Sequence, residues 1–127
     1  FSITWTGTTA PSGTTNHTYQ WSQVGKLVTI RINLVYGTAG SALTSVSMAL
    51  PSDCPSPVDP SGTANGDVIV YGSGELSSAK TPSTYATIAS GNACIRKNSG
   101  GTGYDIVVSR NSSTWRYAYA TITYIAQ

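Results

Sequence analysis

The chain of 127 residues has the length of one domain, and only 9% of its residues are charged, against about 25% in a typical soluble domain. Its formal net charge is +2, and the seven basic residues never cluster beyond a pair, so the basic stripe typical of a nucleic-acid-binding protein is missing. No apolar run has the length needed to span a bilayer. We therefore expect neither nucleic-acid binding nor membrane insertion.

The first half of the chain predicts β-strands. Two short strands are predicted at Ser2–Thr6 and His17–Ser22. The clearest pattern follows at Lys26–Tyr36, where apolar and polar residues alternate with a period of two, as in a strand with one buried and one wet face. The residues expected to be buried are Val28, Ile30, Ile32 and Leu34, and those expected on the wet face are Thr29, Arg31 and Asn33. Another strand, Leu43–Leu50, stops at Pro51.

The second half continues in the same way after a proline-rich connection, which cannot lie in a central strand. The turn dipeptide Asn65-Gly66 precedes the next strand. The strands predicted here are Asp67–Tyr71, Tyr85–Ala89, Ala93–Lys97, Tyr104–Ser109 and Trp115–Ala126. About eight to ten short strands without a helix predict a single all-β domain over residues 1–127, an antiparallel β-sandwich or jelly roll.

The last predicted strand has two different faces. One face carries small and aliphatic residues together with a tyrosine: Ala118, Ala120, Ile122 and Tyr124. The other carries an aromatic strip: Trp115, Tyr117 and Tyr119. A large exposed apolar patch on a soluble protein usually marks an interface. We therefore expect the strip to be covered by another copy of the chain or to bind a ligand.

Residues for catalysis or metal binding are sparse. His17 is the only histidine, and the five acids contain no tight pair, so neither a nucleophilic triad nor a glycosidase pair is indicated. Cys54 and Cys94 with one histidine make no zinc pattern, and we expect both cysteines to be free thiols. The glycine-rich stretch Gly100–Gly103 has no helix after it to bind phosphate. The sequence predicts a protein that is not an enzyme and holds neither metal nor cofactor.

Glycan binding is the stronger functional prediction. Three tryptophans and eight tyrosines can stack on sugar rings, and the abundant Asn, Ser and Thr side chains can hydrogen-bond to hydroxyls. Aromatic residues on strands also serve as core or subunit interface, so that alternative stays open. The candidate ligand contacts are Tyr85, Asn98, Tyr104, Asn111, Trp115 and Tyr117.

A family resemblance begins at Thr18–Ile30, which has a tyrosine, a valine-glycine pair, polar positions and then an alternating Val/Ile strand. This pattern resembles the C-terminal or tip domains of tailed-bacteriophage fibre and receptor-binding proteins, where a leucine-proline such as Leu50-Pro51 often closes a later strand. The opening Trp5–Thr8 and the closing Tyr117–Ile125 are similar to sequences from phages of Bacteroidetes hosts. The positions that match the pattern are Tyr19, Val24, Gly25 and the strand Val28–Leu34.

The resemblance implies a sandwich or jelly-roll head, usually a homotrimer, on a fibre shaft of the same chain at the virion surface. Its expected role is attachment to a host surface glycan or protein. Because the chain starts at Phe1, we expect a C-terminal fragment of a longer fibre protein. Receptor contacts are expected in the loops Gly37–Ser41, Ser77–Ser83, Asn98–Gly103 and Asn111–Thr114. The alternatives are a carbohydrate-binding module of a larger secreted protein and a structural virion component without a receptor.

Overall fold

The computed structural model describes residues 3–77 and 90–127, which contain six β-strands and no helix. The strands are β1 (Ile3–Thr6), β2 (Ser12–Val24), β3 (Leu27–Ala49), β4 (Val68–Ser77), β5 (Ser90–Lys97) and β6 (Tyr104–Ile125). Every pairing between them is antiparallel. The prediction of an all-β antiparallel domain is confirmed. Within the described ranges, no helix is long and apolar enough to cross a membrane.

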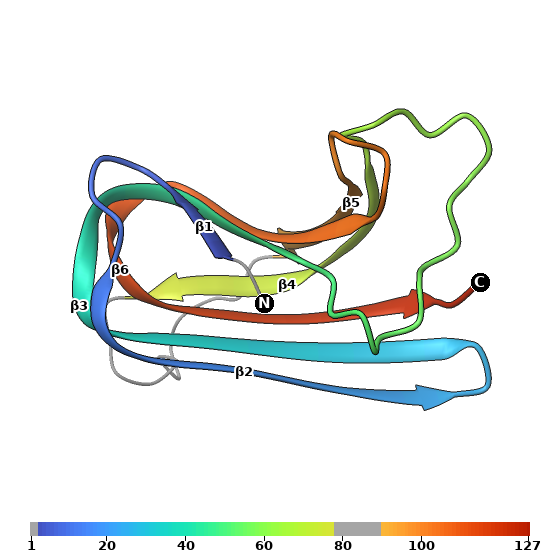
Figure 1. The fold of residues 1–127 in the computed structure, drawn as a ribbon, viewed down its shortest axis with the longest axis horizontal. Helices are drawn as coiled ribbons and strands as arrows, with labels where there is room; N and C mark the ends of the chain where they lie inside the picture. The colour runs from blue at the N-terminus through green and yellow to red at the C-terminus, as the bar shows by residue number, and fades with distance from the viewer. Residues whose placement is uncertain (1–2, 78–89) are drawn as a thin grey trace.

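Two long strands, β3 and β6, organise the fold. They have 23 and 22 residues, and each bends so that the sheet folds over into two layers (Figure 1). In one layer, residues 27–35 of β3 pair with residues 117–125 of β6, and in the other, residues 45–49 pair with residues 105–109. For the part of the chain that is described, the prediction of eight to ten short strands was therefore wrong, because two pairs of predicted strands are halves of single bent strands. The predicted strand Tyr85–Ala89 lies outside the described residues.

The bend is made by irregular pairing and not by a turn. The register between β3 and β6 shifts three times between Val35 and Ser45, and Ala42 adopts a positive φ of 52°. Such bulges add residues to one strand and increase its local bend and twist. The segment Gly37–Ser41, predicted as a loop, is consequently part of β3.

The remaining strands complete the two layers. β2 pairs with the first half of β3, β1 pairs with its second half, and β4 and β5 pair both with each other and with β6. These last three pairings form a closed circuit on one side of the sheet. On the other side, β1 and β2 are edges, because among the described strands each pairs only with β3. A two-residue turn joins β2 to β3, where Gly25 takes a positive φ of 60° that residues with a Cβ rarely adopt.

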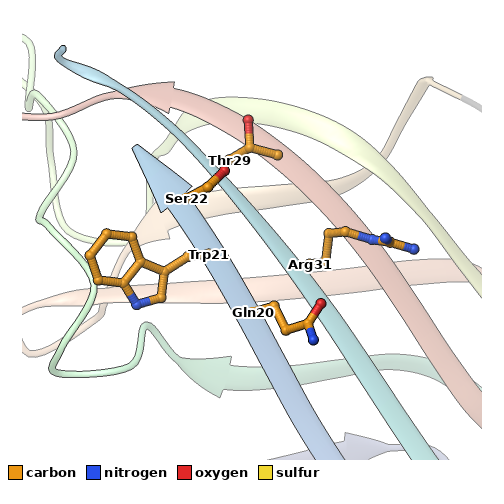
Figure 2. Close-up of a pocket in the computed structure, with 5 residues that line it drawn as sticks. All are labelled: Gln20, Trp21, Ser22, Thr29 and Arg31. Carbon is orange, nitrogen blue, oxygen red and sulfur yellow. The ribbon is translucent and has the colours of Figure 1, made fainter. Parts of the chain in front are cut away.

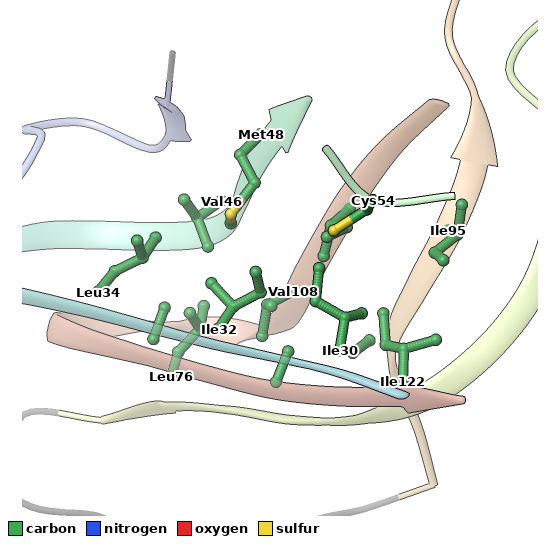
Figure 3. Packing of buried hydrophobic residues seen from close by; sticks show 14 of the residues in the cluster. Ile30, Ile32, Leu34, Val46, Met48, Cys54, Leu76, Ile95, Val108 and Ile122 are labelled. Atoms are coloured by element: carbon green, nitrogen blue, oxygen red, sulfur yellow. The ribbon is translucent and has the colours of Figure 1, made fainter. Parts of the chain in front are cut away.

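The core lies between the layers (Figure 3). The four residues predicted to be buried in the strongest strand are 0–1% exposed, while Arg31 and Asn33 are exposed and Thr29 is half-buried, so the predicted alternation is confirmed. The opposing layer contributes Val46, Met48, Ile95, Ile106 and Val108. The small-residue face of β6, including Ala118 and Ile122, is also buried in this core.

The aromatic strip of β6 is not an exposed interface as predicted. Trp115 is 9% exposed and belongs to the core, and Tyr117 is 2% exposed. Simple alternation along β6 would place Trp115 on the face of the strand opposite to that of Ala118. The register shift at the bend turns Trp115 inward instead. Tyr119 remains half-buried with its ring stacked on that of Tyr117 at 6.1 Å. Trp115 and Tyr117 are thus covered within the chain and do not require a second copy.

The proline-rich connection closes the open side of the core. Cys54 is buried there, and the hydroxyl of Tyr124 donates a hydrogen bond of 2.7 Å to the carbonyl of Pro55. Burial raises the pKa of both the Cys54 thiol and the Tyr124 hydroxyl to about 12. Cys54 and Cys94 are free, as predicted. Because thiolates are the reactive form of cysteine, the burial of Cys54 and its raised pKa make it a poor nucleophile.

Candidate ligand-binding face

One face of the molecule presents three strands side by side to solvent. Antiparallel partners point to the same side of a sheet, and the register aligns Gln20 of β2 with Arg31 of β3 and Thr121 of β6. The rows on either side bring the set on these three strands to nine residues, which we call the outer polar face, and two of the rows continue onto β4 at Ser73 and Glu75. It consists of Thr18, Gln20, Ser22, Thr29, Arg31, Asn33, Tyr119, Thr121 and Thr123. Strand spacings make this face about 10 Å by 14 Å.

The outer polar face is hollowed beside Arg31. A shallow hollow of about 420 Å³ is lined by Gln20, Trp21, Ser22, Thr29 and Arg31 (Figure 2). In Figure 2 the indole of Trp21 extends to the side of β2 away from Arg31. A second hollow of about 160 Å³ adjoins it, and Gln20 and Arg31 line both. The shape suits an extended ligand lying over several side chains better than a small molecule enclosed by them.

The side chains of Tyr19 and Trp21 on β2 are held by the carboxylate of Asp53. The hydroxyl of Tyr19 donates to Oδ1 of Asp53 at 2.8 Å, and Nε1 of Trp21 donates to Oδ2 at 3.2 Å. Both bonds lower the pKa of Asp53, and the bond from Tyr19 has the larger effect. The bond between Tyr19 and Asp53 also raises the pKa of Tyr19. Asp53 thereby joins the proline-rich connection to the edge of the candidate face.

This carboxylate predicts a specific pH dependence. The lowered pKa of Asp53 means that its contribution to stability is present above the unfolded-state pKa of about 3.9 and is lost as the pH falls through the folded-state value. Asp53→Asn should therefore be less stable than the wild type at pH 7, and the gap between their melting temperatures should narrow at pH 3. Thermal unfolding of both proteins at the two pH values measures it. A gap that is the same at both would contradict the role assigned to the Asp53 charge.

A second polar hollow lies where the turn after β5 meets the proline-rich connection. It measures about 260 Å³, and Asp59, Lys97 and Tyr104 are among its lining residues. Nζ of Lys97 lies 3.0 Å from Oδ2 of Asp59, and the Tyr104 hydroxyl donates to the same oxygen at 3.3 Å. Lys97 is the main cause of the lowered pKa of Asp59. Because Lys97 and Tyr104 already occupy Oδ2 of Asp59, a ligand that engaged this oxygen or Lys97 would have to displace existing interactions, and the outer polar face is the better candidate.

The residues predicted from the sequence as ligand contacts do not form one site. Tyr104 lines the second hollow, and Asn98 lies in the adjoining turn, where its side chain accepts a 3.0 Å bond from the Thr102 amide. The burial of Trp115 and Tyr117 leaves little of either ring for a ligand. Asn111 is part of β6, but its side chain is not described, and Tyr85 lies outside the described residues.

The predicted receptor loops are also separated. Gly37–Ser41 and Asn111–Thr114 belong to the bends of β3 and β6, whereas Asn98–Gly103 joins β5 to β6 at the opposite end of the molecule (Figure 1). Only Ser77 of the segment Ser77–Ser83 is described. The three predicted receptor loops that the structure describes therefore do not form a single cluster at one end of the molecule.

His17 and Asp67, which lie outside the hollows, make contacts within the fold. The ring of His17 packs against that of Tyr36 with centroids 5.1 Å apart, and burial lowers the pKa of His17. Asp67 accepts a 3.0 Å bond from the amide of Ala64. In residues 3–77 and 90–127, no group of three His, Cys, Asp or Glu side chains could hold a metal ion.

Sequence reasoning missed most of the outer polar face as a site. It placed Thr29, Arg31 and Asn33 on a wet face, but the partners from β2 and β6 depend on strand register, which no local pattern encodes. Comparisons with protein-family models, curated proteins and solved structures find no match to this chain. The chemistry of the face is consequently the main guide to function.

Proposed function

We propose that this chain is a non-enzymatic virion attachment domain, a sandwich or jelly-roll head at the tip of a phage tail fibre that binds a host surface glycan through the outer polar face. The observation that carries the proposal is the array of mostly exposed hydroxyl and amide side chains across three strands, with the half-buried ring of Tyr119 and two adjoining hollows. Hydroxyl and amide groups match sugar hydroxyls as donors and acceptors. The resemblance of Thr18–Ile30 to fibre-tip domains supports the virion as its setting.

A homotrimer is part of the proposal, and the edge strands of the described sheet support it. β2 is a 13-residue edge strand without a charged residue or a proline, which are the devices that usually prevent an edge from pairing with another chain. The coverage of Trp115 and Tyr117 within the chain favours a second candidate, a monomeric carbohydrate-binding module. Sedimentation at micromolar concentration separates the two, because a trimer supports the fibre head and a monomer supports the module.

Glycan binding is tested by obstructing the outer polar face. Thr121→Tyr places a bulky ring in the middle of the face, and we expect it to abolish retention on a glycan array that retains the wild type. Thr4→Tyr is the matched control, because Thr4 is an exposed strand residue of β1 in the other layer, and it should bind like the wild type. Failure of the wild type to bind any glycan would refute the proposal, and so would the release of cleaved oligosaccharides.

A further inference from the structure

Arg31 stands apart chemically within the outer polar face. It is the one charged residue of the nine, and it is exposed at the centre of the middle strand. In the described part of the chain its guanidinium makes no ion pair or hydrogen bond, whereas Arg96 and Lys97 each lie beside an aspartate. Its cross-strand neighbours Gln20 and Thr121 are neutral.

No ion pair directly across the strands accounts for an arginine at this position. Opposite charges on neighbouring strands stabilise a sheet, but neither strand beside Arg31 supplies a carboxylate directly across from it. The methylene stem can cover some surface, yet the charged head remains in water. The position thus presents a free planar fork of N–H donors, and such a fork matches the two oxygens of a carboxylate.

The surroundings of Arg31 define what else a ligand would meet. Gln20 lies across from it on β2, and Asn33 follows it on the same face of β3, so an amide group flanks the guanidinium on two sides. Both hollows of the face are lined by Arg31. A single cation is too little for nucleic acid, whose binding depends on neutralising many phosphates. It is sufficient to select one carboxylate per bound segment of a sugar chain.

We propose that the outer polar face recognises an acidic polysaccharide, with the carboxylate of a uronic or sialic acid residue on the guanidinium of Arg31. The hydroxyls of that sugar and its neighbours bind Gln20, Asn33 and Thr121. This inference rests on the proposed glycan-binding function and names its ligand class. It distinguishes the receptor from neutral glycans, for which the guanidinium would have no anionic partner.

The test measures binding of the full chain to four carboxylated polysaccharides: polygalacturonate, alginate, hyaluronan and polysialic acid. Methyl-esterified polygalacturonate, dextran and dextran sulfate are the comparison probes. We expect the wild type to bind at least one carboxylated chain, and Arg31→Gln to weaken that binding about tenfold or more, because a charge-assisted pair is lost. Arg31→Lys should recover part of the affinity, since it keeps the charge without the fork. Lys26→Gln, which removes one charge from an exposed turn, should bind like the wild type.

Each other outcome contradicts the acidic ligand in a different way. Equal binding of dextran or the methyl ester, unaffected by Arg31→Gln, would overturn the inference and leave glycan attachment standing. Binding of dextran sulfate alone would overturn the assignment to a carboxylate. An equal loss in Lys26→Gln would show unspecific charge attraction. No binding to any carboxylated chain would overturn the inference, and an empty glycan array would remove the proposed function with it. Melting temperatures of the variants exclude unfolding as the cause.

Discussion

Ile30→Ala will lower the free energy of unfolding by about 2–5 kcal/mol, the usual cost of cutting a buried isoleucine to alanine. Ile30 is 0% exposed and lies across from Ile122 of β6 and Trp21 of β2. It points into the space between the layers (Figure 3). Since both layers contact this space, little collapse can fill the cavity that the substitution leaves.

Chemical denaturation measures this loss, and Ile125→Ala is its control. Ile125 is the same residue type on β6 but is 51% exposed, so its truncation should cost well under half as much. The denaturant midpoint should fall for Ile30→Ala with an unchanged slope, because the surface exposed on unfolding is the same. Similar midpoints for the two variants would contradict the burial of Ile30 between the two layers.

Gly40→Ala is the second substitution with a large expected effect, about 1–3 kcal/mol of destabilisation from overpacking. A Cβ at Gly40 would overlap the carbonyl oxygen of Thr9 and lie 2.8 Å from the backbone nitrogen of Pro11. Backbone atoms cannot rotate away as a side chain can. The segment that joins β1 to β2 would therefore have to move off the bend of β3.

Gly100→Ala provides the comparison for Gly40→Ala. Its added Cβ would meet nothing closer than 3.7 Å, and its backbone has no positive φ, so the melting temperature should change little. A drop at Gly100 equal to that at Gly40 would mean that flexibility, and not close packing at the bend, explains the glycine.

The fold was predictable from the sequence wherever one strand carries its own signal. The alternation from Val28 to Leu34 predicts which side is buried because a strand with one wet face has a period of two. The bend was not predictable, because glycines such as Gly37 and Gly40 usually indicate a turn between two strands. Whether such residues end a strand or form bulges within it depends on a partner strand far away in the sequence, here β6.

The candidate site was predictable in part for the same reason. The wet side of β3, with Arg31, follows from alternation, but Thr121 reaches it only through the register of β6. The choice of Trp115 and Tyr117 as ligand contacts relied on residue type alone. Type alone does not distinguish an aromatic ring that the chain covers from one that it presents.

The pairing of β3 with β6 also governs how the protein is made. β3 ends at Ala49, but its central partner starts only at Tyr104, and a ribosome adding about 5–20 residues per second needs roughly 3–10 s to cover that distance. During this interval the apolar row from Val28 to Leu34 lacks its partner β6 and the part of the opposing layer that β5 and β6 supply, so it can associate with other nascent chains. Slow synthesis lengthens the exposure, and the dominance of distant contacts slows folding itself. Yield in a recombinant host should consequently depend on chaperones that shield this row until β6 emerges.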